Sequence, residues 1–382
     1  MTPAYIFDLD VFSKRIAAIK AALPEIPLVY SIKANPFLLP YLPKEITHIE
    51  VCSPGELAIC RELKASPEKI IYSGVVKEET DITEALSYGA DIITAESIRH
   101  YELIKEAAKK LDKKVKLLLR LSSGNQFGMS EEDMVTVIGD AAEHENIKIC
   151  GVHYYSGTAK KAAQIEEDIK HLDAALDRLK SEASFKCELL EYGPGLAAEY
   201  FAADEDECEK KDMELLEKTA PMIRALSERH SLSIEMGRFM ASSCGCYETA
   251  VMDIKHTDGV DYILVDGGTH HMKYYGPNAA MKVPVVKQES TGSKEDYTIC
   301  GSLCTTADVL VRNITLHEVR IGDTLRFMRT GAYCVTEGTA LFLSRRMPAV
   351  YVTSKKTGKV CVRKEMESYP VNQGQSGDGL ND

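Results

Sequence analysis

The chain has 382 residues, of which 45% are hydrophobic and 27% are charged, a composition typical of a globular protein with one large and one smaller domain. Its formal net charge is −12, so it has no surplus of basic residues. This argues against binding to a nucleic acid or to an anionic membrane. The sequence has no apolar run of membrane-spanning length and no basic and apolar leader, so we expect a cytoplasmic protein.

The eleven cysteines are odd in number, and most stand in apolar runs. Without a signal peptide, we expect most of them to be reduced core residues. Cys244 and Cys246 form a C-x-C pair, and Cys300 and Cys304 form a C-x₃-C pair. Neither pair has a second pair at the spacing that zinc sites use, so we predict no metal site.

Eight short runs rich in Ile, Val and Leu alternate with helical patterns in the first 240 residues. Such runs are typical of parallel strands that are covered on both faces. The runs are Leu28–Ile32, His48–Cys52, Lys69–Ser73, Asp91–Ala95, Val115–Leu121, Ile147–Tyr155, Cys187–Tyr192 and Ser231–Glu235. Eight strands that alternate with helices predict a (β/α)₈ barrel, an α/β fold.

Three of the intervening helices have distinct signals. An apolar stripe runs from Ile165 to Leu179, as on an amphipathic helix. A second helix is predicted to begin after Ser97, an N-cap residue, and to run towards Leu111. A third is predicted to start near Asp212 and to be kinked by Pro221.

After Arg238 the helical periodicity fades, and Gly and Asp separate short β-like segments, which predicts a β-sandwich or open barrel. The segments are Tyr247–Ile254, Tyr262–Asp266, Lys282–Lys287, Tyr297–Cys300, Asp308–Arg312, Thr324–Met328 and Ala349–Val352. We therefore predict a barrel domain over residues 8–238 and a β domain over residues 1–7 and 239–370. The polar tail, residues 371–382, is predicted to be disordered.

The functional residues of a (β/α)₈ barrel lie at the C-terminal ends of its strands, and polar or glycine residues gather there in this sequence. They are Lys33, Ser53, Arg120, His153, Tyr155, Thr158, Gly193, Gly195, Glu235, Gly237 and Arg238. Each alone has a structural explanation, such as a solvated lysine, a Gly-Pro-Gly turn or a surface ion pair. Their occurrence at successive strand ends predicts an active site.

Five motifs follow one another between about Tyr5 and about Ser344. They are Tyr30-Ser-Ile-Lys-Ala-Asn35, Glu50-Val-Cys-Ser-Pro-Gly-Glu-Leu57, Glu235-Met-Gly-Arg238, Cys304 with Asp308, and Gly331-Ala-Tyr333. In this order and at these spacings they resemble the motifs of the fold type III pyridoxal-phosphate decarboxylases. That group contains the diaminopimelate, ornithine and arginine decarboxylases.

The resemblance implies pyridoxal 5′-phosphate as the cofactor, bonded covalently to Lys33. Glu235 would lie beside the pyridine nitrogen and favour its protonated form. Gly193, Gly195, Arg238 and Tyr333 would hold the phosphate. The remaining residues that we assign to cofactor binding are Ser53, Arg120, His153, Tyr155, Thr158 and Gly237.

By the same resemblance, Cys304 would reach the active site of a partner subunit and protonate the carbanion. The enzyme would then be a homodimer with shared active sites. The competing interpretation is a buried structural cysteine.

The sequence departs from its relatives around the cofactor. Many relatives have a histidine at the position of Tyr155, where it stacks on the cofactor ring. An aromatic tyrosine can also stack, and His153, two residues earlier, has the same strand parity, so it either faces the cavity or belongs to the core. Pro194 stands between Gly193 and Gly195 where relatives usually have a third glycine, which removes one N–H donor.

The predicted substrate contacts are Thr305 and Asp308. Diaminopimelate and ornithine decarboxylases have an acidic residue at the position of Thr305, and it helps to receive the distal amine of the substrate. Its loss argues against a free diamino acid. The chain instead resembles the biosynthetic branch, which decarboxylates carboxylate-siderophore intermediates or carrier-bound amino acids, so a carrier protein is a possible partner.

Three alternatives stay open at this point. The first is a diaminopimelate, ornithine or lysine decarboxylase that acts on the free amino acid. The second is an amino-acid racemase of the same fold, although alanine racemases have an arginine at the position of Glu235. The third is a relative without catalytic activity, although Lys33, Arg238 and Tyr333 are all retained.

Overall fold

The structure is a computed structural model that describes residues 2–274 and 280–373. The chain forms two compact units. The barrel unit comprises Ser13–Ala198 and Lys210–Met240, and the β unit comprises Met1–Phe12, Glu199–Glu209 and Ala241–Asp382.

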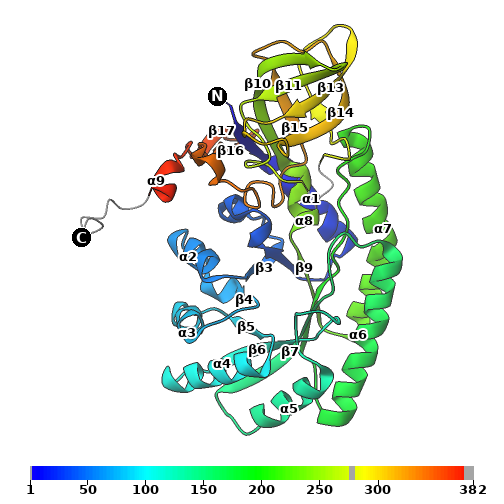
Figure 1. Ribbon diagram of the computed structural model, residues 1–382. Coiled ribbons are helices and arrows are strands. Elements are labelled where there is room, and N and C mark those ends of the chain that lie inside the picture. The colour runs from blue at the N-terminus through cyan, green and yellow to red at the C-terminus, as the bar shows by residue number, and fades with distance from the viewer. Residues whose placement is uncertain (1, 275–279, 374–382) are drawn as a thin grey trace, which may run out of the picture. The chain divides into compact units, whose positions relative to one another are not determined.

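The barrel unit contains a closed barrel of eight parallel strands, β2 to β9, which confirms the predicted (β/α)₈ fold. Figure 1 shows α2 to α6 arranged along the outside of the barrel strands. The strands are β2 (Leu28–Ser31), β3 (Ile46–Val51), β4 (Ile70–Tyr72), β5 (Ile92–Ala95), β6 (Val115–Arg120), β7 (Ile147–Tyr155), β8 (Leu189–Gly193) and β9 (Leu232–Met236). The longer helices are α1 (Leu9–Ala22), α2 (Pro54–Glu62), α3 (Glu79–Tyr88), α4 (Ile98–Lys110), α5 (Glu131–Ala141), α6 (Ala162–Ala183) and α7 (Glu205–Arg229).

The interior of the barrel is built in layers, because every second residue of a strand points inward. The lower layer is apolar and consists of Val29, Ile71, Ile92, Leu118 and Cys150, with Leu189 packed against it. The next layer towards the C-terminal strand ends is polar. It contains Ser31, Glu50, Ser73, Thr94, Arg120, His153, Glu191 and Glu235, all nine-tenths buried or more. The polar layer, which contains candidate functional residues, therefore lies directly on a closely packed apolar layer.

Two of the three helix predictions agree with the structure, and the third is wrong at its start. Ser97 caps α4, because its Oγ accepts a hydrogen bond from the backbone N–H of His100 at 3.1 Å. Helix α7 begins at Glu205, not near Asp212. The cap is Asp204, whose carboxylate accepts the backbone N–H of Glu207 at 2.8 Å, and an acidic first turn follows, which favours this helix end.

The β unit is built around a nine-stranded sheet with the order β14-β13-β11-β10-β1-β16-β17, in which β15 pairs with β10 and β12 pairs with β15. β1 runs antiparallel to β10 and parallel to β16. The strands are β1 (Ala4–Asp8), β10 (Gly245–Thr257), β11 (Val260–Val265), β12 (Val286–Lys287), β13 (Lys294–Cys300), β14 (Val309–His317), β15 (Thr324–Met328), β16 (Ala349–Ser354) and β17 (Gly358–Arg363). The predicted β-rich domain is confirmed.

Three details of the β unit differ from the prediction. The central strand β1 was not predicted as a strand, although residues 1–7 were assigned to the β domain. The predicted strand Lys282–Lys287 contains only the two residues of β12. The strand β17 was not predicted, because it is an edge strand that pairs only with β16 and carries no alternating buried pattern.

The boundary between the units also differs from the predicted one, because residues 199–209 belong to the β unit. The Tyr200 ring contacts the Tyr274 ring edge-on at 6.0 Å. Glu209 lies 3.7 Å from the guanidinium of Arg329. These contacts join the segment to residues of the β unit.

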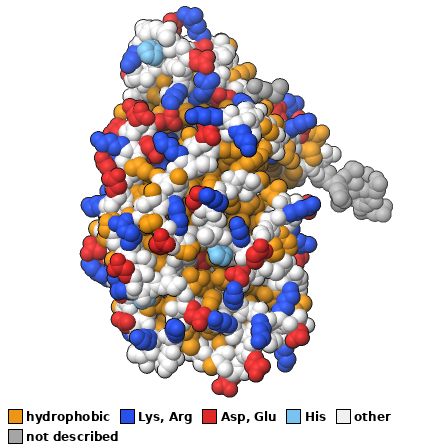
Figure 2. Space-filling view, turned by 180° about the vertical axis from the view of Figure 1, so that it is seen from behind, with side chains coloured by type: hydrophobic (Ala, Val, Ile, Leu, Met, Phe, Trp, Pro, Cys, Tyr) orange, Lys and Arg blue, Asp and Glu red, His pale blue; other side chains and the backbone are white. Residues whose placement is uncertain are grey.

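The start of the predicted disordered tail, residues 371 and 372, belongs to the short helix α9 (Tyr369–Asn372), and residues 374–382 lie outside the described residues. Within the described residues, no helix is long and apolar enough to cross a membrane. On the face shown in Figure 2, acidic and basic side chains are interspersed.

Candidate active site

Lys33 stands in a short 3-10 turn, η1 (Ile32–Ala34), directly after β2. Its neighbours Ile32 and Ala34 are buried, which fixes the turn, whereas the lysine side chain is 38% exposed. Its Nζ lies 2.7 Å from Glu50 Oε2 and 3.6 Å from Glu235 Oε1. The amine is therefore ion-paired and still accessible from solvent.

Ser31 connects the two carboxylates that flank this amine. Its hydroxyl lies 2.6 Å from Glu50 Oε2 and also forms a hydrogen bond with Glu235 Oε1. Burial alone would raise the pKa of Glu235, but the charge of Lys33 and the hydrogen bond from His153 outweigh it, so the pKa lies well below its usual range. Glu235 is therefore a buried, ionised carboxylate.

His153, near the end of β7, is buried and points to Glu235, with Nε2 3.1 Å from Glu235 Oε2. Next to it in register is Arg120 at the end of β6. Arg120 pairs with Glu96 at 2.8 Å, and its guanidinium lies 4.8 Å from the centre of the Phe127 ring. The predicted residues of these two strands are thus inside the barrel, and His153 is a hydrogen-bond partner of Glu235.

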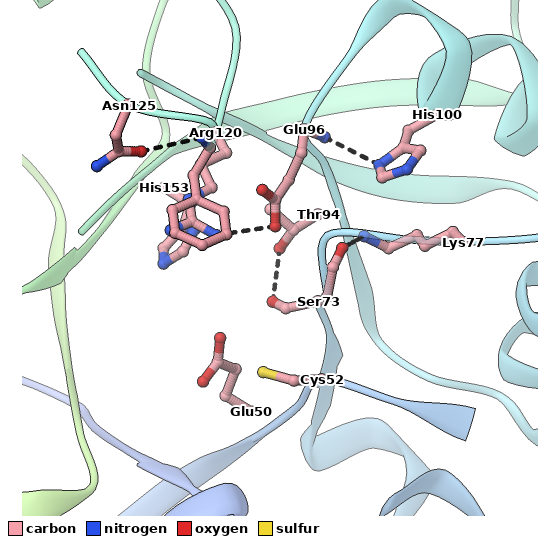
Figure 3. Close-up of polar contacts among 12 residues, drawn as sticks. Glu50, Cys52, Ser73, Lys77, Thr94, Glu96, His100, Arg120, Asn125 and His153 are labelled. Carbon is pink, nitrogen blue, oxygen red and sulfur yellow. Dashed lines mark hydrogen bonds and ion pairs between the residues drawn. The ribbon is translucent and has the colours of Figure 1, made fainter. Parts of the chain in front are cut away.

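Figure 3 shows this end of the barrel, with Ser73 and Thr94 side by side. Their hydroxyl oxygens are 3.1 Å apart. Beside them, Lys77 donates to the carbonyl of Gly74, and burial lowers its pKa to about 8. In contrast to Lys33, Lys77 is consequently a buried amine.

Tyr155 and the glycines of the neighbouring strand fit against each other closely. A Cβ at Gly193 would lie 2.7 Å from the Tyr155 ring, and a Cβ at Gly195 would lie 1.9 Å from the carbonyl oxygen of Gly157. Gly195 also has a φ of +58°, and its carbonyl accepts the N–H of Lys160 at 2.8 Å. Only glycine fits at both positions, and Gly195 lies in a tight loop that packs directly against the backbone of Gly157.

The other predicted residues of the barrel unit lie at the same strand ends. Ser53 caps α2, since its Oγ accepts the N–H of Glu56 at 3.1 Å. Thr158 forms a side-chain hydrogen bond with Tyr155. Gly237 follows β9, and Arg238 begins the short helix α8 (Arg238–Ala241) and lies near enough for its charge to lower the pKa of Tyr155 against the larger opposing effect of burial.

The remaining predicted residues belong to the β unit. Cys304 and Thr305 are exposed in the loop between β13 and β14. Cys304 is therefore not the buried core cysteine of the competing interpretation. Tyr333 has a φ of +66°, a strained conformation for an aromatic residue, and its carbonyl accepts the N–H groups of Thr336 and Glu337 at 2.9 Å.

Asp308 holds the loop that carries Cys304. Its buried carboxylate accepts the backbone N–H of Thr269 at 2.7 Å, the hydroxyl of Thr269 at 2.8 Å and the backbone N–H of Leu303 at 2.8 Å. These bonds give Asp308 a structural role, and its contact with a substrate stays a prediction.

Sequence reasoning did not assign a role to several acidic residues of the polar layer, namely Glu50, Glu96 and Glu191. Each stands within or directly after an apolar strand, where a carboxylate is rarely buried unless it is paired. An acidic residue in or directly after an apolar strand was therefore the feature of the sequence that could have indicated a functional role. Within the described residues, Glu50, His153 and Glu235 could also hold a metal ion by their spacing, but the Lys33 ammonium already lies between the two carboxylates.

Comparison with known proteins identifies the family of this chain. Residues 9–242 match the family model described as pyridoxal-dependent decarboxylase, pyridoxal binding domain. This match covers more than half of the chain, so the chain belongs to the pyridoxal-dependent decarboxylase family, and the predicted family is confirmed.

Two relatives show the range of this family. The chain is 26% identical to the L-glutamyl-[BtrI acyl-carrier protein] decarboxylase of Niallia circulans, over 91% of this chain and 87% of that protein. It is also 26% identical to the 2-[(L-alanin-3-ylcarbamoyl)methyl]-2-hydroxybutanedioate decarboxylase of Staphylococcus aureus, over 92% of this chain and 94% of that one. The solved diaminopimelate decarboxylase of M. jannaschii has the same fold, with a TM-score of 0.85, 24% identity and coverage of 96% and 90%.

Proposed function

We propose that this chain binds pyridoxal 5′-phosphate through Lys33 and decarboxylates an amino acid or an amino-acid conjugate. One observation carries the proposal: the Lys33 amine and the ionised Glu235 carboxylate lie 3.6 Å apart at the C-terminal end of one barrel. The same strand ends carry Gly193 and Gly195, the two glycines to which the family resemblance assigns the phosphate. The residues present therefore fit the cofactor that the family uses.

The residues around Lys33 have complementary roles in this proposal. Glu235 would hold a proton on the ring nitrogen of the cofactor, because an ionised carboxylate stabilises an adjacent cation. Bound pyridoxal phosphate supplies the electron sink for the charge that remains when carbon dioxide leaves. A carboxylate at this position favours decarboxylation over the racemase alternative, whose proteins carry an arginine there.

Two positions that the sequence left open can now be assigned separate roles in this proposal. Tyr155 is half-buried, with its ring against Gly193, and we assign to it the stacking contact with the cofactor ring. His153 forms a hydrogen bond with Glu235, so we assign to it the support of that carboxylate. The phosphate contacts of Gly193, Gly195, Arg238 and Tyr333, the cofactor contacts of Ser53, Arg120, Thr158 and Gly237, and the proton donation by Cys304 stay predictions.

The substrate that we favour has no cationic distal amine. Thr305 is neutral where diaminopimelate and ornithine decarboxylases have an acidic residue. The two relatives above, whose names specify a carrier-bound glutamyl group and a hydroxybutanedioate derivative, support a substrate from the same biosynthetic branch. A carrier protein is then a possible partner, and a free diamino acid is the alternative.

The assembly and the location are also proposals. Shared active sites with a contribution from Cys304 require a homodimer. All eleven cysteines are thiols, which fits the reducing environment of the cytoplasm.

The cofactor assignment is tested with two lysine variants. The purified protein should be yellow and should lose its visible absorption when borohydride reduces the bond between lysine and cofactor. Lys33→Met should be colourless, because Lys33 supplies the amine that lies beside both carboxylates. Lys77→Met is the matched control, since Lys77 is a buried amine near the same strand ends, and it should keep the colour. A colourless Lys77→Met with a coloured Lys33→Met would contradict the assignment.

The reaction is tested by carbon dioxide release from a panel of free amino acids and of amino acids bound to carrier proteins or citrate-like acids. Release from the conjugates alone supports the biosynthetic branch. Release from free diamino acids supports the alternative, and inversion of optical rotation without gas supports a racemase.

The role of Cys304 is tested by Cys304→Ala, which should slow turnover about 100-fold or place the proton incorrectly, with cofactor colour unchanged. Cys361→Ala is the control, because Cys361 is the other exposed cysteine. Equal rates and products for both variants would remove Cys304 from the reaction.

A further inference from the structure

Three polar side chains lie side by side at the same level inside the barrel. In the strand pairing, His153 of β7 is opposite Glu191 of β8, and Glu191 is opposite Ser233 of β9. Register partners on parallel strands point to the same face, and their Cβ atoms are about 5 Å apart. All three residues are at most 3% exposed. Glu191 belongs to neither the predicted site nor the proposed reaction.

Four buried polar atoms of these side chains have no hydrogen-bond partner among the residues that the structure describes. They are His153 Nδ1, both carboxyl oxygens of Glu191 and Ser233 Oγ. A buried polar atom without a partner costs about 1–3 kcal/mol, so four such atoms in one place on adjacent strands call for a common explanation.

We propose that Glu191 is a neutral carboxylic acid that positions His153. In this arrangement Ser233 donates its hydroxyl to the carbonyl oxygen of Glu191, and the Glu191 O–H is donated to His153 Nδ1. Small side-chain rotations or one bridging water complete these two bonds. His153 then carries its proton on Nε2, which is the nitrogen that faces Glu235 at 3.1 Å.

The charges around Glu191 determine the direction of the hydrogen bonds from Ser233 through Glu191 to His153. Glu191 is influenced by Glu235 and Glu50, which are acidic, and by Lys33, which is basic. Arg120, on the strand next to β7, is paired with Glu96. An ionised Glu191 would be a third carboxylate facing one lysine. Burial first, and then the charges of Glu235 and Glu50, raise the pKa of Glu191 well above its usual value.

When Glu191 is neutral, each donor in this hydrogen-bond chain has one acceptor: the Ser233 hydroxyl, the Glu191 O–H and the His153 Nε2–H are all used. Glu235 receives the Nε2–H of His153 on one oxygen, and its other oxygen lies near Ser31 and Lys33. Glu191 is a positioning residue that acts through His153 on the carboxylate. Only the consequence for the cofactor rests on the proposed function; the hydrogen-bond chain does not.

The protonation of Glu191 is tested by infrared difference spectroscopy of the full-length protein. The wild type should show the C=O stretching band of a buried carboxylic acid at neutral pH, shifted in D₂O. Glu191→Gln should lose that band. Thr94→Val is the matched control, because it removes another fully buried hydroxyl group of the same layer, and it should keep the band. A wild type without the band overturns the proposal.

The orientation of His153 is tested by ¹⁵N NMR of histidine-labelled protein, with His153→Gln to assign the signals. The wild type should show one tautomer, protonated at Nε2. Glu191→Met keeps the length of the side chain but removes the donor, so the signals should move to a mixture of tautomers. Glu191→Gln should restore the single tautomer, because its amide donates to Nδ1. An unchanged tautomer in Glu191→Met overturns the proposal, whether or not the protein binds a cofactor.

Loss of the orientation should also reduce turnover. For Glu191→Met we expect kcat/KM to fall about tenfold, as for other residues that orient a catalytic group, with Glu191→Gln closer to the wild type. Equal values for the two variants would mean that the side chain fills space only.

Discussion

Gly195 shows how one residue can determine the shape of the loop after β8. It has a φ of +58°, and the carbonyl of Gly157 occupies the space where a Cβ would lie, at 1.9 Å. Any other residue therefore meets both backbone strain and a collision with a second loop. The two loops can approach because neither carries a side chain at the contact.

From this contact we predict that Gly195→Ala lowers the free energy of unfolding by more than the roughly 1 kcal/mol of a left-handed alanine alone, and weakens cofactor binding. Chemical denaturation and titration with pyridoxal phosphate measure the two effects. Gly358→Ala is the control, because Gly358 has a similar φ of +66° and nothing within 4 Å of its Cβ position. Equal losses of stability in both variants would show that the contact with Gly157 contributes nothing.

At the residue scale, the motifs predicted the catalytic end of the barrel, because chemistry requires particular residue types there. They did not predict that His153 would bind Glu235, since strand parity leaves a core position equally possible. Glu191 was missed because its role depends on its register partners, and register cannot be read from one strand.

Among the secondary-structure elements, α4 has the clearest start. Ser97 accepts the N–H of His100 and so satisfies one of the N–H groups that every helix leaves unpaired at its start. The helix connects β5 to β6 and packs through His100, Tyr101 and Ile104. Its cap is therefore a local contribution to the stability of the barrel.

We predict that Ser97→Ala lowers the free energy of unfolding by about 1 kcal/mol. The control is Ser181→Ala within α6, an exposed helical position where alanine is the better helix former. A stability loss in the control as large as that of Ser97→Ala would contradict the capping role.

At the element scale, all eight barrel strands could be predicted from the sequence, since strands buried on both faces have continuous apolar runs. Two of the elements that were missed are half-exposed or depend on a cap. β17 is an edge strand with exposed valines, and the first turns of α7 are acidic and polar, so neither carries a hydrophobic pattern.

For the molecule as a whole, buried histidines determine how stability responds to acid. Burial lowers the pKa of His100 and of His270 to about 4, and that of His271 to about 3. An unfolded histidine titrates near 6.5, so the unfolded chain binds more protons between that pH and the folded pKa values. Stability is therefore expected to fall as the pH drops through this window.

We predict that His271→Gln makes this fall smaller, by about 1.4 kcal/mol for each pH unit that its titration contributes. The variant should be less stable at pH 7, because it loses contacts with Tyr247 and with the carbonyl of Arg346. Urea denaturation between pH 7 and pH 4 measures the slope. A slope in His271→Gln equal to that of the wild type would contradict the prediction.

Asp308 also links two distant parts of the chain, because it receives hydrogen bonds from Thr269 and from Leu303. A second link joins the same segments, where Ser302 donates its N–H to the carbonyl of Gly267 at 2.8 Å. The Cys304 loop is thus surface-exposed at its tip and anchored at its base. The loop is therefore already ordered at its base, so little conformational entropy would be lost if the Cys304 thiol contacts another molecule. Because the amides of Thr269 and Leu303 both donate to Asp308, we expect their hydrogen-exchange rates to change together when Asp308 is replaced.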